Sequence, residues 1–312
     1  MAQKISIIGA GTMGRGIAQV AAQSGFQVLI WDELPQALQS ARETIDKNLN
    51  REVEKSRLDA DQVKSIQNRL QFVSGIEELK QADLIIEAIR EDVRIKHALL
   101  KELETGLGKD VILLTNTSSL SVTELAQALE HRHRFAGLHF FNPVPSMKLV
   151  EIISSLDTSA EVLEKLENFS RQIGKVPIRV PDSPGFLVNH AGRGYGPEAL
   201  RILADHIARP ADIDRIMKDL PGFRMGPFEL MDLVGLDVAH PVMEQIYNQF
   251  YQDPLYGPNV LAQTQMMAGR LGRKTGRGWY EYRQGKAVFP PEKSFPGKSG
   301  ASPRVWISPA EP

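Results

Sequence analysis

The sequence contains no cysteine, which excludes disulfide bonds, thiolate nucleophiles and cysteine-ligated zinc sites. Its net charge is only −1, so the composition gives no reason to expect nucleic acid or an anionic membrane as a partner. No apolar run approaches the roughly 20 residues that a transmembrane helix needs. A strand-like run begins at residue 4. We therefore expect no membrane span and no signal peptide, and we predict a cytoplasmic protein.

What is present fits a globular protein with two domains. The chain has 312 residues, of which 42% are hydrophobic and 24% charged, and this length is sufficient for two domains. Up to about residue 183, short β-branched runs alternate with amphipathic stretches, which is typical of a doubly wound, mostly parallel α/β sheet. The expected strands cover residues 4–8, 26–31, 70–73, 83–87, 111–114, 135–139, 148–153 and 176–180. The expected helices of this half begin after the glycines of residues 9–14 and cover residues 35–55, 59–69, 93–105, 121–129 and 160–173.

The second half has a different pattern. Residues 181–185 (PDSPG) interrupt the chain, and helical periods without strand signals follow. These helices are expected at residues 186–207, 211–220, 227–234, 236–251 and 260–268. We predict an α/β Rossmann-type doubly wound sheet with an inserted helical arm over residues 1–183, followed by an all-α domain over residues 184–282. Residues 283–312 are rich in proline, and they are either an extended arm on the body or a linker into a region absent from this chain.

A glycine-rich turn near the start of the chain predicts a dinucleotide site. Gly9, Gly11 and Gly14 have G-x-G-x-x-G spacing between an apolar run and a helical pattern. In such a unit the first glycine permits the turn, the second lets the backbone approach a pyrophosphate, and the third lets helix and strand pack closely. The N-terminus of the helix then supplies N–H donors and a positive dipole to the phosphates.

Asp32 indicates which dinucleotide would bind. It ends the second apolar run, 23 residues after Gly9. An acid at this point can accept hydrogen bonds from both ribose hydroxyls of NAD and would repel the 2′-phosphate of NADP. The alternative is an ordinary βαβ turn with a surface aspartate.

His139 is the best candidate for proton transfer. It comes at the C-terminal end of an expected strand, where open α/β sheets bind ligands. Glu151 lies twelve residues later on the next strand, and antiparallel pairing would bring it beside His139. A carboxylate on one imidazole nitrogen fixes the tautomer and leaves the other nitrogen to exchange a proton with a hydroxyl. The alternative is a hydrogen-bonded histidine with a structural role.

Two further polar segments could contribute to the same site. Residues 116–119 (NTSS) follow the strand at residues 111–114, and their side chains suit contact with a nicotinamide amide or a substrate oxygen. They could instead form the turn and N-cap of the next helix. Asn189 is either on the polar face of a helix or a donor in a cleft. The helix pair at residues 35–69 is either a solvated hairpin or an arm that reaches a ligand.

Together these segments resemble the L-3-hydroxyacyl-CoA dehydrogenase family over about residues 3–282. The resemblance rests on motifs that occur in the same order along the chain: residues 9–14 (GAGTMG), 87–89 (EAI), 116–120 (NTSSL), 139–145 (HFFNPVP), 184–189 (PGFLVN), 225–230 (MGPFEL) and 272–278 (GRKTGRG). It implies an NAD-dependent enzyme of the fatty-acid β-oxidation type that acts on an acyl-CoA. It also implies a homodimer held through the helical domain, which serves substrate binding and dimerisation.

The resemblance also implies roles for single residues. His139 would be the general acid/base and Glu151 its partner, while Ser118 and Asn189 would flank the substrate oxygen. Lys55 matches a lysine that approaches the CoA moiety, although a solvated helix charge would explain it equally. Cofactor contacts are implied at Gly9, Gly11, Thr12, Met13, Gly14, Asp32, Glu91, Lys96, Asn116, Asn142 and Lys274.

The sequence departs from the family pattern after Asn189. Family members usually have arginine at the position of His190, and residues 191–196 (AGRGYG) are unusually rich in glycine for a helix. We therefore expect a kink or a loosened turn there, close to where relatives hold substrate.

Residues 222–232 look most like bacterial members of phenylacetate-type catabolism, which act on 3-hydroxyadipyl-CoA. A 3-hydroxybutyryl-CoA dehydrogenase is the alternative substrate class. A non-catalytic NAD-binding relative is a second reading, and a β-hydroxyacid dehydrogenase with a lysine base is a third. Longer bacterial relatives continue into another helical domain, so the chain could be a fragment.

Overall fold

The computed structural model describes residues 4–291, which form two compact units. The sheet unit consists of the described residues up to Pro197 together with Pro241–Pro258. The helical unit consists of Glu198–His240 together with the described residues from Asn259 onward. Helix α11 (Leu236–Gln249) contributes residues to both units.

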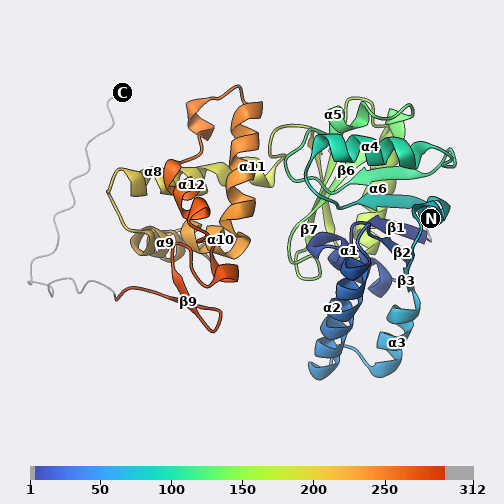
Figure 1. Cartoon of the computed structure of the whole chain (residues 1–312), viewed down its shortest axis with the longest axis horizontal. Coiled ribbons are helices and arrows are strands. Elements are labelled where there is room, and N and C mark those ends of the chain that lie inside the picture. The colour runs from blue at the N-terminus through green and yellow to red at the C-terminus, as the bar shows by residue number, and fades with distance from the viewer. Residues whose placement is uncertain (1–3, 292–312) are drawn as a thin grey trace, which may run out of the picture. The chain divides into compact units, whose positions relative to one another are not determined.

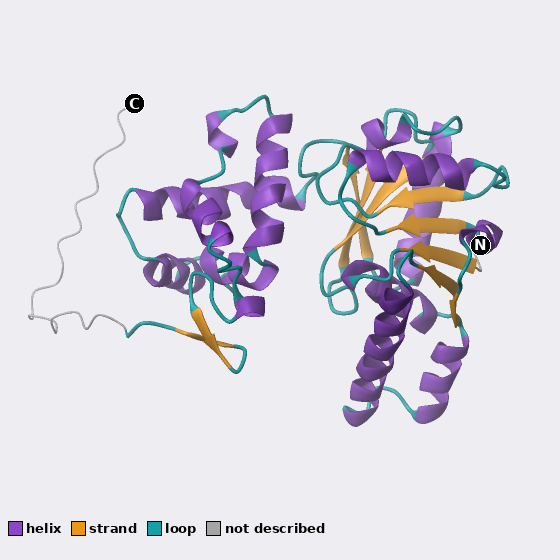
Figure 2. Cartoon of the chain, viewed as in Figure 1, coloured by secondary structure: helices purple, strands orange, loops and turns teal. Residues whose placement is uncertain are grey.

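The sheet unit is built on one eight-stranded sheet in the order β3-β2-β1-β4-β5-β6-β7-β8 (Figure 2). All neighbours are parallel except β6 and β7, which pair antiparallel. The strands are β1 (Lys4–Ile8), β2 (Gln27–Trp31), β3 (Leu70–Phe72), β4 (Leu84–Glu87), β5 (Ile112–Thr115), β6 (Phe135–Phe140), β7 (Leu149–Ser154) and β8 (Val176–Pro181). Each predicted strand of this half is present, and the predicted mostly parallel, doubly wound sheet is confirmed.

Helices cover both faces of this sheet (Figure 1). One face carries residues of α1 (Thr12–Gln23), α2 (Pro35–Glu54), α3 (Ala60–Asn68) and α6 (Ala160–Gln172). The other face carries residues of α4 (Val93–Glu104), α5 (Val122–Ala126) and the 3-10 helix Ile76–Gln81. The inserted arm is the α2–α3 pair, which extends away from the strands (Figure 1). A capping box at Asp59 starts its second helix.

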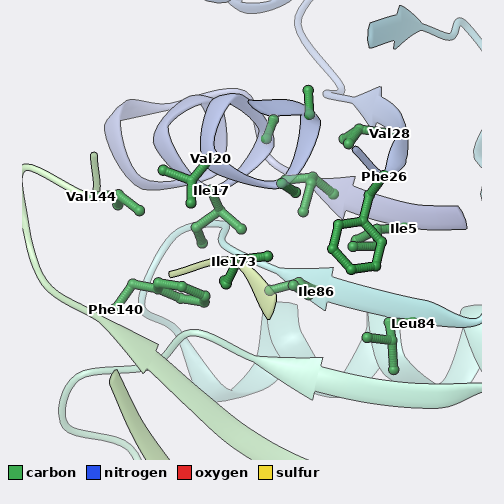
Figure 3. Close-up of a cluster of buried hydrophobic side chains, with 14 of the residues drawn as sticks. Ile5, Ile17, Val20, Phe26, Val28, Leu84, Ile86, Phe140, Val144 and Ile173 are labelled. Carbon is green, nitrogen blue, oxygen red and sulfur yellow. The ribbon is translucent and has the colours of Figure 1, made fainter. Parts of the chain in front are cut away.

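The core lies in two apolar layers, one on each side of the strands. Successive side chains of a strand point to opposite faces, so Ile7 belongs to one layer and Ile8 to the other. Figure 3 shows the first layer, where Ile17 and Val20 of α1 face the strand residues. Because both faces are covered, the strands are mostly apolar, which is why apolar runs in the sequence predicted them.

The glycine turn joins β1 to α1 by close backbone packing. Gly9 has φ +96°, a conformation that residues with a Cβ rarely adopt. A Cβ on Gly14 would lie 1.8 Å from the Gly9 carbonyl oxygen, so only glycine lets the helix approach the strand this closely. The packing role predicted for Gly14 therefore follows directly from the coordinates.

The segment after Asn189 is irregular, as predicted. Instead of one helix over residues 186–207, the chain forms α7 (Val188–Ala191), a 3-10 turn (Gly192–Gly194) and α8 (Gly196–Ala204). The glycines at residues 192, 194 and 196 are the reason, because glycine favours a helix less than other residues do.

The helical unit contains the other predicted helices and one unpredicted hairpin. Its further helices are α9 (Pro210–Asp219), α10 (Pro227–Val234) and α12 (Val260–Met267). Strands β9 (Glu281–Arg283) and β10 (Lys286–Val288) then pair antiparallel, although no strand was predicted after residue 181. Gln284 and Gly285 turn between them with φ 50° and 75°, which suits a tight hairpin turn. These two strands are largely exposed and mix charged with apolar residues, so they give no apolar run in the sequence.

Among residues 4–291, no helix is both long enough and apolar enough to cross a membrane. The proline-rich residues from 292 to the end lie outside the described part, so the alternatives of an extended arm or a linker stay predictions for them.

The contact beneath the glycine turn gives a stability test. Gly14→Ala places a Cβ against the Gly9 carbonyl oxygen and should lower the free energy of unfolding by about 3 kcal/mol or more. Gly11→Ala is the matched control, because within residues 4–291 no atom lies within 4 Å of its Cβ position. The control should cost less than about 1 kcal/mol. Urea denaturation measures both, and equal stabilities would contradict the packing argument.

Candidate functional site

The N-terminus of α1 is shaped to receive an anion. Its first residue follows Gly11, which provides no side-chain cap, so the first N–H groups of the helix have no partner within it. The space beside Gly11 is open in the described chain, and a ligand could approach the backbone there. Uncapped N–H groups and the helix dipole favour negative charge. These residues fit the pyrophosphate of a dinucleotide.

Asp32 lies beside this turn at the end of β2. Its Oδ2 accepts a hydrogen bond from the Ala10 N–H (2.7 Å) and its Oδ1 accepts one from the Leu34 N–H (2.9 Å). These bonds hold the carboxylate next to the glycine turn. Each oxygen has a second lone pair that can accept from a ribose hydroxyl, and the negative charge disfavours a phosphate at the same place.

His139 and Glu151 form a buried pair on β6 and β7, several strands away from β1 and β2 in the sheet. They stand opposite each other in the antiparallel β6–β7 register, as the twelve-residue spacing predicted. The His139 Nδ1 is 2.7 Å from the Glu151 Oε2, and the two side chains are 7% and 0% exposed. The rings of Phe141 and Phe186 lie 4.5 Å and 5.8 Å from the imidazole, measured between centroids.

This pair has the geometry for proton transfer. With Nδ1 donating to the carboxylate, Nε2 is the nitrogen left to exchange a proton, and it makes no hydrogen bond to any residue of the described chain. A buried carboxylate stabilises the imidazolium that forms when Nε2 takes a proton. The low exposure strengthens this interaction, because few water molecules screen it.

Glu151 also fixes the start of α7. Its second oxygen, Oε1, accepts hydrogen bonds from the Leu187 N–H (3.0 Å) and the Val188 N–H (2.8 Å). One carboxylate therefore holds both the imidazole and the segment that carries Asn189. This second contact was not predictable from the sequence, because its donors are backbone groups of apolar residues.

The polar segment after β5 is connected to the same group of residues. Asn116 Oδ1 accepts from the Phe140 N–H (2.8 Å), which ties this segment to β6 next to His139. Asn189 donates from Nδ2 to the Ser118 carbonyl oxygen (3.1 Å). The Ser118 side chain is half-buried, and its hydroxyl makes no hydrogen bond within residues 4–291. The hydroxyl is therefore available to a ligand.

Two glutamines that were not predicted also hold this segment. Gln245 contacts the Ser119 hydroxyl, and Gln249 donates from Nε2 to the Ser119 carbonyl oxygen (2.6 Å). They are four residues apart on α11 and so lie on one face of the helix. This spacing is the only sequence signal that they carry.

Glu91 and Lys96, which were predicted to contact the cofactor, lie in a buried ionic cluster. The Lys96 Nζ is 2.6 Å from Glu87 Oε1 and 3.2 Å from Glu91 Oε2. Burial alone would raise the pKa of Glu91, but Lys96 and the donors Thr117 and Ser118 outweigh it and lower the pKa. Glu91 is thus held as a carboxylate. Glu87 was not predicted as part of the site, and the contact of Thr117 with Glu91 was not predicted either.

The remaining predicted residues are dispersed. Thr12 and Met13 begin α1, and Asn142 follows β6 at a cis peptide bond to Pro143. Lys55 ends α2, half exposed and 3.5 Å from Glu52. Lys274 lies in the helical unit, where it pairs with Asp237. The predicted contacts of these residues with cofactor or substrate stay predictions.

The comparisons with known proteins agree with this geometry. A family model described as the NAD binding domain of 3-hydroxyacyl-CoA dehydrogenase matches residues 4–183. The model of the C-terminal domain of the same family matches residues 185–282. The chain belongs to the 3-hydroxyacyl-CoA dehydrogenase family. Its first domain is the NAD binding domain of this family of NAD-dependent oxidoreductases, as the glycine turn and Asp32 predicted.

Individual relatives of this family cover most of the chain. The chain is 43% identical over 281 residues to 3-hydroxyadipyl-CoA dehydrogenase from Escherichia coli, covering 90% of this chain and 59% of that protein. It is 38% identical to mitochondrial hydroxyacyl-coenzyme A dehydrogenase from Sus scrofa, covering 91% and 92%. The solved structure of (S)-3-hydroxybutyryl-CoA dehydrogenase from Ralstonia eutropha has a TM-score of 0.87 and 40% identity, covering 91% and 100%. The chain therefore spans less than two thirds of the Escherichia coli protein but nearly the full length of the other two.

The buried carboxylate of Glu151 gives a second stability test. In Glu151→Gln one oxygen becomes an amide NH₂ that faces either the His139 Nδ1–H or the two N–H groups at the start of α7. Thermal unfolding should show a loss of about 1–3 kcal/mol. Glu161→Gln removes an exposed partner of Lys165 and should leave the unfolding midpoint almost unchanged. Identical midpoints for both variants would refute the shared role of Glu151.

Proposed function

We propose that the chain catalyses the reversible oxidation of L-3-hydroxyacyl-CoA to 3-oxoacyl-CoA. The observation that carries the proposal is the buried His139–Glu151 pair, on the sheet that also carries the glycine turn and Asp32. Family membership supports the substrate class, since the relatives are named 3-hydroxyacyl-CoA, 3-hydroxyadipyl-CoA or 3-hydroxybutyryl-CoA dehydrogenases. Bound NAD supplies the acceptor for the hydride that leaves C3.

The residues of the chain act on the oxygen of the substrate. His139 accepts the proton of the 3-hydroxyl at Nε2, and Glu151 stabilises the resulting imidazolium through Nδ1. Ser118 and Asn189 lie close enough to be linked by a hydrogen bond, and their polar groups stabilise charge on the same oxygen. In the reverse direction the protonated His139 donates the proton back.

The family membership also supports assignments of cofactor and substrate contacts. Residues 1–183 bind the cofactor and residues 184–282 serve substrate binding and subunit contact, a division that the extents of the two family models support. Lys55, half exposed at the end of the α2–α3 arm, contacts the CoA moiety. The residues assigned to NAD are Gly9, Gly11, Thr12, Met13, Gly14, Asp32, Glu91, Lys96, Asn116, Asn142 and Lys274.

The substrate is either 3-hydroxyadipyl-CoA or 3-hydroxybutyryl-CoA, and the former would place the enzyme in phenylacetate catabolism. The names of the relatives support both. A non-catalytic role is disfavoured because the chain keeps His139, Glu151, Ser118 and Asn189.

We also propose a cytoplasmic homodimer. Apolar residues exposed on the helical unit support a subunit contact there, among them Leu220, Leu230, Leu233, Val234 and Val238.

An assay of NADH oxidation tests the proposal. Acetoacetyl-CoA should be reduced and free acetoacetate should not, because the family acts on CoA thioesters. NADPH should support much slower turnover, since Asp32 repels its 2′-phosphate. Equal rates with NADPH would show that the role given to Asp32 is wrong. A second comparison of kcat/KM for 3-hydroxybutyryl-CoA and 3-hydroxyadipyl-CoA decides between the two substrates.

Replacing the proton acceptor tests the mechanism. His139→Gln should lower turnover roughly 10³-fold, while the affinity for NADH, measured by fluorescence titration, stays within about twofold of the original. His133→Gln changes an exposed histidine and should leave both quantities as they are. Turnover of His139→Gln close to that of the unmodified enzyme would overturn the assignment.

A further inference from the structure

Lys96 is a lysine in an apolar setting. It lies on the buried face of α4 with Leu99, Leu100 and Leu103, and only 1% of its surface is exposed. A lysine this deeply buried needs an ionic or hydrogen-bonding partner. Its partners are two carboxylates from the segment that connects β4 to α4, so the ion pairs form within ten residues of chain.

Glu87 anchors one side of the cluster to the sheet. Its Oε1 accepts from the Lys96 ammonium (2.6 Å) and from the Ile89 N–H (2.7 Å). Its Oε2 accepts from the Thr115 hydroxyl at the end of β5 (2.7 Å). Glu87 is 1% exposed, and its partners are the Lys96 ammonium on α4 and groups at the ends of the neighbouring strands β4 and β5.

Glu91 connects the ammonium to the polar segment after β5. Its Oε2 faces Lys96 at 3.2 Å, and its Oε1 accepts from the Thr117 hydroxyl (2.5 Å) and from the Ser118 N–H (2.9 Å). A hydrogen bond from an N–H to an ionised carboxylate is roughly twice as strong as one between neutral groups. The backbone of Ser118 is therefore held by a charge that Lys96 keeps in place.

We propose that Lys96 and Glu91 are positioning residues that set the backbone of Ser118 and thereby aim its hydroxyl at the substrate. The inference rests on the proposed dehydrogenase function. It gives both residues a role on the acyl-CoA side of the reaction, in addition to the cofactor contact assigned to them. The contacts that set the Ser118 backbone run from the Lys96 ammonium to the Glu91 carboxylate and from there to the Ser118 N–H. Glu87 holds the Lys96 ammonium at the buried end of this chain of contacts.

The geometry makes the charge of Glu91 essential to this role. In Glu91→Gln, one end of the amide carries NH₂ where the carboxylate had an acceptor. That NH₂ faces either the Lys96 ammonium or the Ser118 N–H, and both are donors. Either orientation breaks the connection while keeping the size of the side chain. Misplacing a substrate-contacting group by about 1 Å can cost about 100-fold in rate.

The experiment compares substrate and cofactor parameters in matched variants. Glu91→Gln and Lys96→Met should lower kcat/KM for acetoacetyl-CoA, measured at saturating NADH, between about tenfold and 100-fold. The Kd for NADH is measured separately, because both residues are also assigned a cofactor contact. Glu161→Gln and Lys165→Met are the controls, because these residues form an exposed ion pair on α6, away from the Ser118 segment. Circular dichroism verifies folding, and Glu91→Gln keeps the test valid if Lys96→Met unfolds.

A double-mutant cycle with Ser118→Ala separates positioning from general structural support. If Glu91 acts through the Ser118 hydroxyl, Glu91→Gln should cost much less in the Ser118→Ala background than in the unmodified enzyme. A purely structural role would lower activity by the same factor in both backgrounds.

Two results would overturn the inference while the unmodified enzyme is active. One is additive effects of Glu91→Gln and Ser118→Ala on kcat/KM for acetoacetyl-CoA. The other is a loss confined to NADH affinity. An inactive unmodified enzyme would instead refute the proposed function and, with it, this inference. The proposal stands if the losses fall on acetoacetyl-CoA and are not additive.

Discussion

The arrangement of the site depends on the buried carboxylate of Glu151, which has protein partners on both of its oxygens. One oxygen binds the imidazole of His139 and the other binds the first N–H groups of α7. An uncompensated charge at this depth would be costly, so its partners cannot move away without a penalty. The imidazole and the segment that carries Asn189 are therefore held together by the same group.

The two ends of the site favour opposite charges. At the glycine turn the protein offers N–H groups without side-chain partners, which suits an anionic ligand. At β6 and β7 it offers a carboxylate behind an imidazole, which suits transient positive charge. Strands β4 and β5 lie between these two ends. The cluster around Lys96 lies where these strands end, and it orders the polar segment at residues 116–119. Among the described residues, the buried charges of Glu87, Lys96 and Glu151 each have a protein partner.

Much of the fold was predictable because local pattern and tertiary structure agree. Buried strands are continuous apolar runs, and the glycine turn requires residues without a Cβ. The His139–Glu151 contact was also predictable, since antiparallel strands pair residues at a fixed spacing. The partners of Glu91 and Lys96 were not. Two partners of Glu91, Thr117 and Ser118, are more than twenty positions away in the chain, and nothing local distinguishes Thr117 from any other threonine in a turn. The β9–β10 hairpin was missed because its strands are short and largely exposed, and so form no continuous apolar run.

The strand order has a consequence for how such an enzyme can be modified. Asp32 follows β2 and His139 ends β6, and three strands separate them in the sheet. Four strand spacings of ~4.8 Å put the two about 19 Å apart along the sheet. The two side chains share no hydrogen-bond partner among the described residues, so the effects of their substitution on stability should be additive. The two ends of the strand order can therefore be altered separately without unfolding the sheet between them.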